Sequence, residues 1–504
     1  MVSRRRSSAW TGRRTGPVCA TIETMQAAEE LSPLQRWLVM AAVGSGILLS
    51  TLDGNIVNIA LPTLERAYQA DFPTVQWVVL AYLLTLATLM LSIGRLADMI
   101  GKKPIYTLGF ILFTIGSTLC ALAPTIYWLI GFRVFQAVGG AMILALGMAI
   151  VTESFPSAQR GLALGVSGGL VSTGVVLGPL LGGLILGLGS WHWIFLVNLP
   201  VGIVGTLMVV KFVPDFRPKG EQKFDLPGAL SLFASLICLL LALTWGQQVG
   251  FADRRILALL AGFLIGLVWF IWVELRTSNP MLELGMFRNR AFSISLLTGL
   301  ATFMGIAGSV LLMPFYLENV LGYTPQQVGM MMSVTPLVLV VAAPVSGWLS
   351  DRMGTRPITL VGLLVLLVGY ASLATLQINT SVGGYLVRFL PVGLGMGIFQ
   401  SPNNSTIMGA AKRERLGVVS GMLALNRAIG QTTGVALLGA LWAGRVGFYA
   451  GGLPPGGATE ADPLAQVAGM QDAFWGIVIL IFLALLLSVW GLVKGRTEAA
   501  NGSQ

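Results

Sequence analysis

One carboxylate, Asp53, lies well inside a long apolar stretch of the sequence, where a charge is costly. If that stretch crosses a membrane, an ionised side chain at its centre costs about 2.5 to 3.5 kcal/mol, so a functional role is the default expectation. Counting 1.5 Å per helical residue, Asp53 lies roughly 13 Å from one end of its stretch, and Arg133 lies roughly 10 Å from the corresponding end of another. We therefore predict that these two side chains are neighbours in the folded chain.

A carboxylate beside a guanidinium can bind and release a proton when the two groups move. Burial disfavours the ionised carboxylate and the nearby guanidinium favours it, so separating or joining Asp53 and Arg133 would change the affinity for a proton strongly. We predict a proton switch here, and the alternative is a permanent ion pair that stabilises the fold. Gln136, one helical turn from Arg133, either relays a hydrogen bond or simply packs.

The segment GRLADMIGKKP at 94–104 is a charged turn between two apolar stretches, and GWLSDRMGTRP at 347–357 repeats its spacing 253 residues later. In the first copy a glycine, an aspartate and a glycine recur at i, i+4 and i+7, which places them on one helix face. The second copy retains the aspartate. We predict a conformational latch, with an ordinary solvated loop as the alternative. Its residues are Gly94, Asp98, Gly101, Lys102, Lys103 and Asp351.

Small residues and a proline mark another apolar stretch as a predicted gate. Gly174, Gly178 and Gly182 form a flat stripe at i, i+4 and i+8, which permits close helix approach. Pro179 removes one backbone hydrogen bond within that stripe. These residues predict a bendable, tightly packed gating helix, and generic packing without a gating role is the alternative.

Polar and aromatic side chains in other apolar stretches are candidates for a small-molecule cavity. An amide without a partner in hydrocarbon is expensive, and binding cavities combine aromatic walls with a few polar groups. Arg427 either binds an anionic group or pairs with a polar side chain of another stretch. The predicted cavity residues are Phe135, Gln136, Gln400, Asn403, Asn404 and Arg427.

The composition identifies the surroundings of these residues. Of the 504 residues, 55% are hydrophobic and 10% are charged, whereas an average soluble domain has about 25% charged residues. These values indicate an integral membrane protein. A single histidine and three widely separated cysteines argue against a metal site and a disulfide framework, and the sequence has no GxxxxGK[ST] phosphate loop. We expect no enzyme activity, no metal and no cofactor.

Fourteen apolar runs reach roughly 20 residues, the length of helix that crosses about 30 Å of hydrocarbon. They predict an all-α integral membrane protein with 14 transmembrane helices. Lys and Arg collect in cytoplasmic loops. With both termini in the cytoplasm, 24 of the 31 basic residues are cytoplasmic, four are external and three lie within spans. Membrane topology thus explains the net charge of +10, and we expect no nucleic-acid partner.

The chain also contains an internal repeat. The segment FRVFQAVGGAM around Arg133 is similar to VRFLPVGLGMG around Arg388. Two six-helix halves related by an axis along the membrane normal would place a substrate site at their interface. The predicted organisation is a cytoplasmic tail at 1–36, a six-helix bundle at 37–213, cytoplasmic linkers with two inserted helices at 214–289, a six-helix bundle at 290–493 with an external loop at 445–473, and a cytoplasmic tail at 494–504.

Several motifs resemble those of the major facilitator superfamily, and within it those of the fourteen-span drug:proton antiporters. Besides the charged turn, RVFQAVGGA resembles the fourth-span motif and GVVLGPLLGG resembles the fifth-span motif associated with export. Four further sequences resemble the fourteen-span subfamily: LDGNIVNIALP at 52, SWHWIFLVNLP at 190, FDLPGA at 224 and FRNRAFS at 287.

The resemblance implies a multidrug efflux transporter of the plasma (inner) membrane, of the kind that confers antibiotic resistance. It would export amphipathic or cationic compounds by rocking its two halves around a central cavity, driven by inward proton flow. Its partners would be the lipid bilayer, the substrate and protons, and an accessory export partner is left open. Two alternatives remain. One is a carrier of the same fold for a specific metabolite, and the other is a membrane sensor or scaffold that does not transport.

Overall fold

The structure, a computed structural model, describes residues 31–156, 159–215, 226–250, 252–277, 284–409, 416–454 and 457–501. The first group of helices comprises α2 (Pro33–Tyr68), α3 (Phe72–Ile100), α4 (Lys102–Ala121), α5 (Ile126–Ser154), α6 (Arg160–Gly187), α7 (Trp193–Leu196) and α8 (Asn198–Phe212). Next come α9 (Leu226–Val249) and α10 (Arg254–Arg276). The last group comprises η2 (Leu284–Arg288), α11 (Arg290–Phe315), η3 (Tyr316–Val320), α12 (Pro325–Met353), α13 (Thr355–Leu373), α14 (Val382–Gly409), α15 (Leu416–Tyr449), η5 (Ala458–Glu460) and α16 (Pro463–Asn501).

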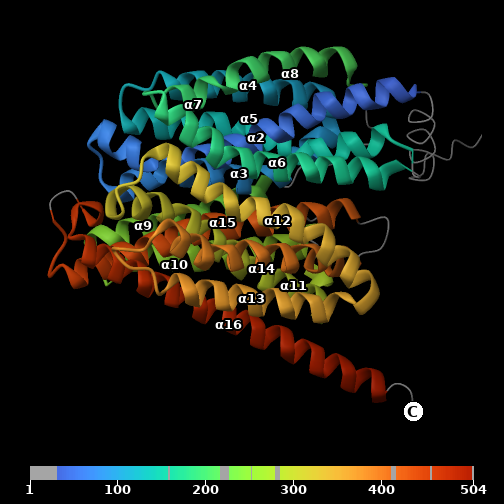
Figure 1. Cartoon of the computed structure of the whole chain (residues 1–504). Helices are drawn as coiled ribbons and strands as arrows, with labels where there is room; N and C mark the ends of the chain where they lie inside the picture. Colours follow the sequence, from blue (N-terminus) through green and yellow to red (C-terminus); the bar gives the residue numbers. More distant parts are fainter. Residues whose placement is uncertain are drawn as a thin grey trace, which may run out of the picture.

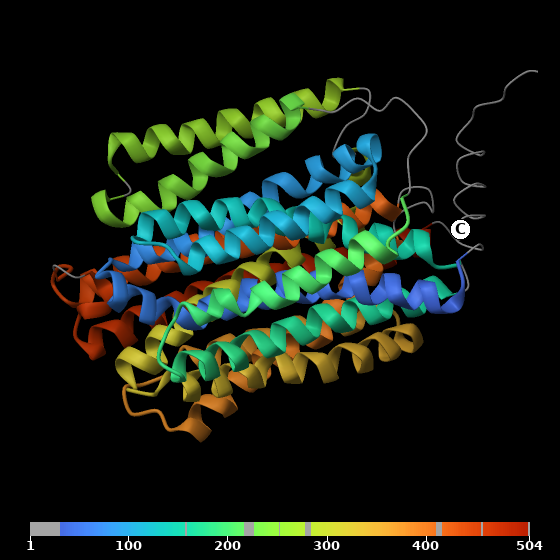
Figure 2. The same ribbon diagram turned by 90° about the horizontal axis from the view of Figure 1, so that it is seen from above.

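These helices form two bundles that lie side by side (Figure 1). The first bundle holds α2 to α8 and the second holds α11 to α16. They meet mainly where α6 packs on α12 and where α3 packs on α15. Helices α9 and α10 form a hairpin along one side of the bundles (Figure 2), and α9 contacts both α3 and α15.

The helices run roughly parallel, so the molecule has two ends. Helix α2 begins and α16 ends at the same end, on the right of Figure 1, which we call the proximal end. The other end carries the turns at 69–71, 321–324 and 450–462, and we call it the distal end. The predicted topology makes the proximal end cytoplasmic.

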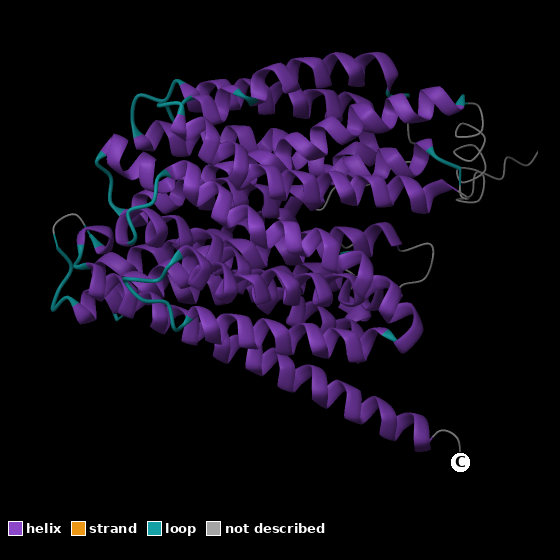
Figure 3. Cartoon of the chain, viewed as in Figure 1, coloured by secondary structure: helices purple, strands orange, loops and turns teal. Residues whose placement is uncertain are grey.

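Twelve helical segments in the described part of the chain are long and apolar enough to cross a membrane. The described residues form only helices and loops (Figure 3), which confirms an all-helical membrane protein. The long helices α9 and α15 are not among the twelve segments; in α9 only Leu230–Leu243 qualifies, as a shorter apolar helix. Helix α15 carries Asn426, Arg427 and Gln431, which lower its hydropathy. The fourteen-span count therefore stays a prediction.

The repeated charged turn has the same backbone conformation in both bundles. Gly101 joins α3 to α4 with φ of 110°, and Gly354 joins α12 to α13 with φ of 86°. Side chains other than glycine rarely adopt such positive φ values. The two turns therefore require glycine, and the repeat in the sequence corresponds to a repeat in the fold.

Two predicted boundaries differ from the observed helices. The predicted loop at 445–473 is shorter, because α15 continues to Tyr449 and α16 begins at Pro463. Trp442 Nε1 donates to the carbonyl of Gln466 at 3.1 Å, which ties these helix ends together. The predicted tail at 494–504 is helical up to Asn501, because the last helix runs beyond its apolar part.

Candidate functional site

Asp53 of α2 lies at the centre of a buried polar network inside the first bundle. Its Oδ2 accepts a hydrogen bond from Arg133 Nη1 at 2.6 Å. Its Oδ1 accepts from Gln136 Nε2 at 2.9 Å and from Asn198 Nδ2 at 2.8 Å. Asn198 Nδ2 also donates to Ser117 Oγ at 3.0 Å. Side chains from α2, α4, α5 and α8 therefore meet at one carboxylate.

The network is closed to solvent in this conformation. The side chains of Asp53 and Arg133 are 0% and 1% exposed. The Nε of Arg133 donates to the carbonyl of Val78 at 3.2 Å, and its guanidinium carbon lies 4.0 Å from the centre of the Tyr82 ring. Both charged groups thus have several partners, which offsets part of the cost of removing two ions from water.

Close helix packing and the junction of two short helices bring these side chains together. A Cβ at Gly116 of α4 would lie 2.6 Å from Gln136 Cα, so glycine there allows α5 to approach. Helix α7 is a single turn, and α8 begins at Asn198 directly after Val197. Ser117 Oγ donates to the carbonyl of Phe195 at 2.8 Å, which holds the junction of α7 and α8 against α4. The amide of Asn198 is therefore held beside Asp53.

The structure brings together the two residues that the sequence predicted to be neighbours, Asp53 and Arg133. Gln136 hydrogen-bonds to both of them, so the structure places it in this network. The role of the pair in proton coupling stays a prediction.

Sequence reasoning missed two members of the network. Asn198 is an amide within an apolar run, in the quoted motif SWHWIFLVNLP, and this amide could have marked it. Ser117 carried no comparable signal, since hydroxyl side chains are common within apolar helices and bond to their own backbone.

The predicted latch is described only in part. The side chain of Asp98 lies outside the described residues. Lys102 forms an ion pair with Glu153 of α5, which ties the charged turn to the end of that helix. Asp351 is exposed at the proximal end, and a Cβ at Gly94 would meet no atom within 4 Å. Lys103 is partly buried. These positions leave the latch a prediction.

The predicted gating helix, α6, packs its glycine stripe against α2. A Cβ at Gly174 would overlap Thr51, and one at Gly178 would lie 2.5 Å from Asn55 Cβ. A Cβ at Gly182 would lie 3.0 Å from Ile56 Cγ1. The helix that carries Asp53 is therefore in direct backbone contact with the stripe that contains Pro179.

The next glycine of α6 lies at a close backbone contact between the two bundles. A Cβ at Gly183 would lie 2.6 Å from the carbonyl oxygen of Pro325 and 2.9 Å from Gly329 Cα in α12. A Cβ at Gly329 would in turn lie 2.8 Å from Gly183 Cα and would overlap the carbonyl of Pro179. Here α6 and α12 touch through their backbones, near the distal end.

Other contacts between the bundles lie at the same end. Gln76 Nε2 of α3 donates to the carbonyl of Val435 in α15 at 2.6 Å. The ring of Phe72 lies 5.0 Å from that of Phe315 and 4.7 Å from that of Trp442. Thr459 donates to Glu65. These contacts close the distal end of the interface between the bundles.

The ion pair between Arg66 and Glu318 is part of this distal closure, and only one of its two side chains is buried. Arg66 Nη2 donates to Glu318 Oε2 at 2.5 Å, and their side chains are 59% and 2% exposed. Replacing Arg66 with Met would leave the buried carboxylate without its cation, and we expect a loss of about 1 to 3 kcal/mol of stability. Glu318→Gln should cost less than about 1 kcal/mol, because a neutral amide needs no counterion. Denaturation of the purified protein in detergent measures both, and equal losses would contradict this assignment.

The predicted cavity residues do not form one site. Phe135 is 37% exposed, on the same face of α5 as the exposed Tyr127 and Trp128. Residues two apart on a helix point in different directions, so Phe135 does not share the face of Arg133, and its role in a cavity stays a prediction. Gln400 and Asn404 are partly buried on α14, with no hydrogen bond to any other described residue.

Asn403 and Arg427 instead lie inside the second bundle, where α14 and α15 approach α11. A Cβ at Gly299 of α11 would lie 3.3 Å from Asn403 Nδ2 and 3.1 Å from Asn426 Nδ2. Arg427 lies over the ring of Phe303, 5.2 Å from its centre. Within the described part of the chain, the Arg427 guanidinium has neither a hydrogen bond nor an ion pair. It is a partly buried cation.

Arg388 is the counterpart of Arg133 in the second bundle, and it has different hydrogen-bond partners. Its Nε donates to Thr375 Oγ1 at 2.9 Å, and its Nη1 donates to the carbonyl of Gly384 at 3.0 Å. These partners are neutral: Thr375 follows the distal end of α13, and Gly384 lies in the first turn of α14. The described part of the second bundle thus pairs no carboxylate with Arg388, and the buried ion pair belongs to the first bundle.

Comparisons with known proteins agree with this architecture. Residues 43–435 match the family model of the Major Facilitator Superfamily. The structure is similar to that of a bacterial homolog to the human lysosomal transporter Spinster in an inward-facing and unoccupied conformation, with a TM-score of 0.63 at 17% identity. That match covers 92% of this chain and 98% of the other. A POT family transporter in complex with 5-aminolevulinic acid gives a TM-score of 0.65 at 16% identity, over 91% and 96% of the two chains.

Relatives with higher identity have different named substrates. The riboflavin transporter RibZ of Clostridioides difficile is 33% identical over 91% of this chain and 98% of that protein. The multidrug resistance protein Stp of Mycobacterium tuberculosis is 34% identical over 81% and 76% of the two chains. The multidrug transporter protein MdtP of Bacillus subtilis is 31% identical over 89% and 84%. The chain therefore belongs to the major facilitator superfamily, as a multi-pass membrane transporter of small molecules and not an enzyme.

Proposed function

We propose that this protein is a proton-coupled exporter of amphipathic or cationic compounds. The observation that supports this most directly is the network around Asp53, where a buried carboxylate faces one cation and two amides. A group in this position can exchange a proton only when the surrounding helices move. Proton binding and helix movement are therefore coupled by the geometry.

Helix α2 links the network to the moving parts. Thr51 and Asn55, on either side of Asp53, contact the glycines of α6. When Asp53 takes up a proton, its attraction to Arg133 falls, because a neutral carboxyl group lacks the charge that the guanidinium pairs with. The position of α2 against α6 can then change, and α6 in turn contacts α12 of the other bundle. This sequence of contacts carries the proton signal to the distal closure.

We further propose fourteen transmembrane helices, with α9 and α15 added to the twelve apolar segments. Helix α15 packs against α11 and α16 within the second bundle and reaches α3 of the first. Its polar residues Asn426 and Arg427 contact Leu296 and Phe303 of α11. Helix α9 pairs with α10, which is one of the twelve segments. With fourteen spans both termini lie on one side, and the distribution of Lys and Arg assigns that side to the cytoplasm.

The relatives favour two substrate classes. Stp and MdtP are named as multidrug proteins, which supports a broad range of exported compounds. RibZ, whose match covers nearly its whole length, is named as a riboflavin transporter. The second candidate function is therefore transport of a single planar metabolite by the same fold.

Uptake into inside-out membrane vesicles tests the proposal. A pH gradient is imposed and then collapsed, and accumulation of ethidium is followed by fluorescence, with radiolabelled riboflavin as a parallel substrate. Gradient-dependent accumulation of ethidium supports drug export. Accumulation of riboflavin without ethidium would favour the metabolite carrier, and accumulation that is indifferent to the gradient would contradict proton coupling.

The unpaired Arg427 predicts how the substrate range responds to its removal. A cation several ångströms away repels a cationic substrate and attracts a carboxylate, at about 1 to 3 kcal/mol in a partly screened site. Rhodamine 110 and its methyl ester rhodamine 123 form a matched pair that differs at one carboxylate. We expect Arg427→Gln to change the ratio of their transport rates about 10-fold in favour of the ester. Arg427→Lys, which keeps the charge, serves as the control, and an unchanged ratio in the Gln variant would remove Arg427 from substrate selection.

A further inference from the structure

A basic pocket at the proximal end of the second bundle lies outside the network and the interface described above. It is a cavity of about 450 Å³ between α11, α13, α14 and α16. Arg288, Arg290, Arg356 and Lys494 contribute four cationic side chains to its lining. Among the described residues that line it, none is acidic. Such a cavity attracts an anion.

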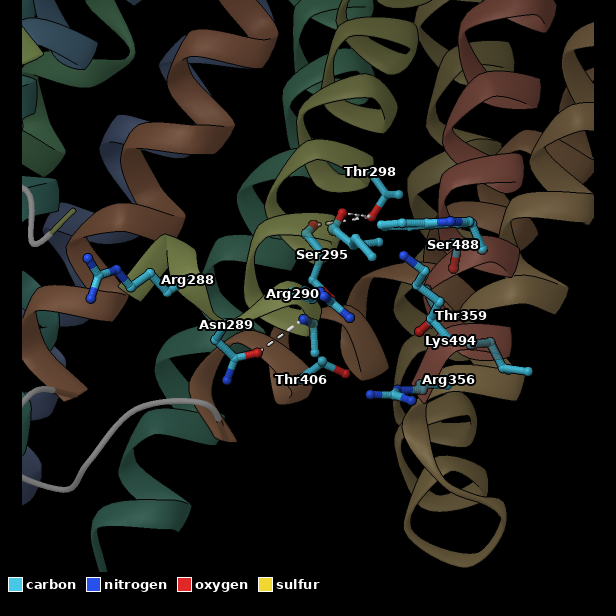
Figure 4. A pocket seen from close by; sticks show the side chains of 15 residues that line it. Arg288, Asn289, Arg290, Ser295, Thr298, Arg356, Thr359, Thr406, Ser488 and Lys494 are labelled. Carbon is cyan, nitrogen blue, oxygen red and sulfur yellow. Dashed lines mark hydrogen bonds between the residues drawn. The ribbon is translucent and has the colours of Figure 1, made fainter. Parts of the chain in front are cut away.

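The arrangement of the lining points to an anion within the pocket. In Figure 4 Arg290, Arg356, Thr359 and Lys494 lie around the same space, whereas Arg288 points away from the rest. Ser295 and Thr298, which are 8% and 1% exposed, are the buried part of the lining. The Thr298 and Thr359 hydroxyls donate to carbonyls of their own helices. Guanidinium groups suit phosphate oxygens, which accept several hydrogen bonds at once.

Two helices also begin at this pocket. Helix α11 starts at Arg290 and α13 starts at Thr355, next to Arg356. The side chain of Asn289 caps α11 by accepting from the N–H groups of Ala291 and Phe292. Helix α13 has Gly354 at its N-cap and no side-chain cap. The free N–H groups at the start of α13 favour an anion, and here they adjoin Arg356.

The depth of the pocket relative to the membrane indicates where its ligand comes from. Trp490 and Lys494 of α16 line it, with the Lys494 ammonium 4.9 Å from the centre of the Trp490 ring. Trp and Lys near the end of a span mark the headgroup level of a bilayer. From there Leu486, Trp490 and Val493 form an exposed apolar stripe along α16 at i, i+4 and i+7, with exposures of 49%, 47% and 55%. Acyl chains fit that stripe.

We propose that this pocket binds the phosphate of an anionic phospholipid, with the acyl chains along α16. Free phosphate has the same headgroup chemistry but makes no use of the apolar stripe. The end of α16 leads away from the second bundle (Figure 1), so a lipid can enter from the side. This binding is independent of which compound is transported and of proton coupling.

Native mass spectrometry of the purified full-length protein tests the proposal. The protein is titrated with phosphatidylglycerol, with zwitterionic phosphatidylcholine and with inorganic phosphate. The test variant is Arg290→Gln with Arg356→Gln. The matched control, Arg276→Gln with Arg352→Gln, removes two cations that lie over the rings of Trp272 and Trp348 outside the pocket.

We expect wild type and the control to bind phosphatidylglycerol in preference to phosphatidylcholine. The test variant should bind it about 25-fold more weakly, since each cation near an anionic headgroup contributes about fivefold. Arg356→Gln alone, expected to weaken binding about fivefold, replaces the double variant if that variant does not fold. Equal binding by the test variant and wild type, or equal binding of the two lipids, would overturn the proposal. Binding of inorganic phosphate that displaces the lipid would overturn the lipid assignment in favour of a free anion.

Discussion

Asp53→Asn is expected to abolish accumulation driven by a pH gradient while substrate exchange continues. A gradient of about two pH units can drive accumulation up to about 100-fold for one proton per substrate, because each unit contributes about 1.4 kcal/mol. Asparagine has nearly the same shape but binds no proton in this range, so accumulation should fall to about onefold. Exchange of internal for external ethidium across the same vesicles needs no proton and should persist.

Two controls separate coupling from damage to the fold. Asp253→Asn changes the same groups at the N-cap of α10, where Asp253 accepts from Arg255 N at 2.7 Å and asparagine caps equally well. It should transport like wild type. Asp53→Asn leaves the Arg133 guanidinium without its counterion and is expected to lose about 3 to 5 kcal/mol of stability. The double variant Asp53→Asn with Arg133→Gln should recover part of that loss. Accumulation that survives in Asp53→Asn would remove this carboxylate from proton coupling.

Gly183→Val is expected to prevent closure of the distal end and to reduce transport about 10-fold or more. Its side chain would meet the Pro325 carbonyl and the Gly329 backbone, and neither can turn away as a flexible side chain could. Forcing atoms into a packed contact costs about 1 to 3 kcal/mol, which changes the ratio of closed to open molecules about 5- to 150-fold. The distally open state should therefore accumulate.

Cysteine labelling reports this shift directly. Phe72 is 0% exposed between the rings of Phe315 and Trp442. Phe72→Cys should therefore react slowly with an impermeant maleimide in the wild-type background and faster alongside Gly183→Val. The matched control is Gly169→Val in the same helix, where a Cβ would meet no atom within 4 Å. Normal transport by Gly183→Val, with no change in labelling, would show that the contact between α6 and α12 does not control the distal end.

The central ion pair could be predicted from the sequence because helix rise is fixed. Counting residues from the ends of two spans gave Asp53 and Arg133 similar depths, and the composition required a buried charge to find a partner. Asn198 could not be placed in this way, since its position along a span does not show which neighbouring helix its side chain faces. Depth says nothing about direction around a helix, so the exposed position of Phe135 could not be predicted from the sequence.

Arg427 shows a second limit on what can be predicted from the sequence. Its residue type and depth raised two possibilities, a bound anion or a polar partner from another span. Only the positions of neighbouring helices distinguish them, and here α11 presents the ring of Phe303 to the guanidinium. The repeat was clear from the glycines of the charged turns, but the different partners of Arg133 and Arg388 depend on side chains that the two bundles do not share.

The hairpin of α9 and α10 affects how the two bundles can move relative to each other. Helix α9 places Leu236 and Leu240 against Leu84 of α3 and Ile429 of α15, one from each bundle. Leucine and isoleucine surfaces attract without a preferred direction, so they can slide past each other with little change in energy. We therefore expect the hairpin to stay on this side of the interface during transport, with apolar contacts that let the two bundles shift relative to each other.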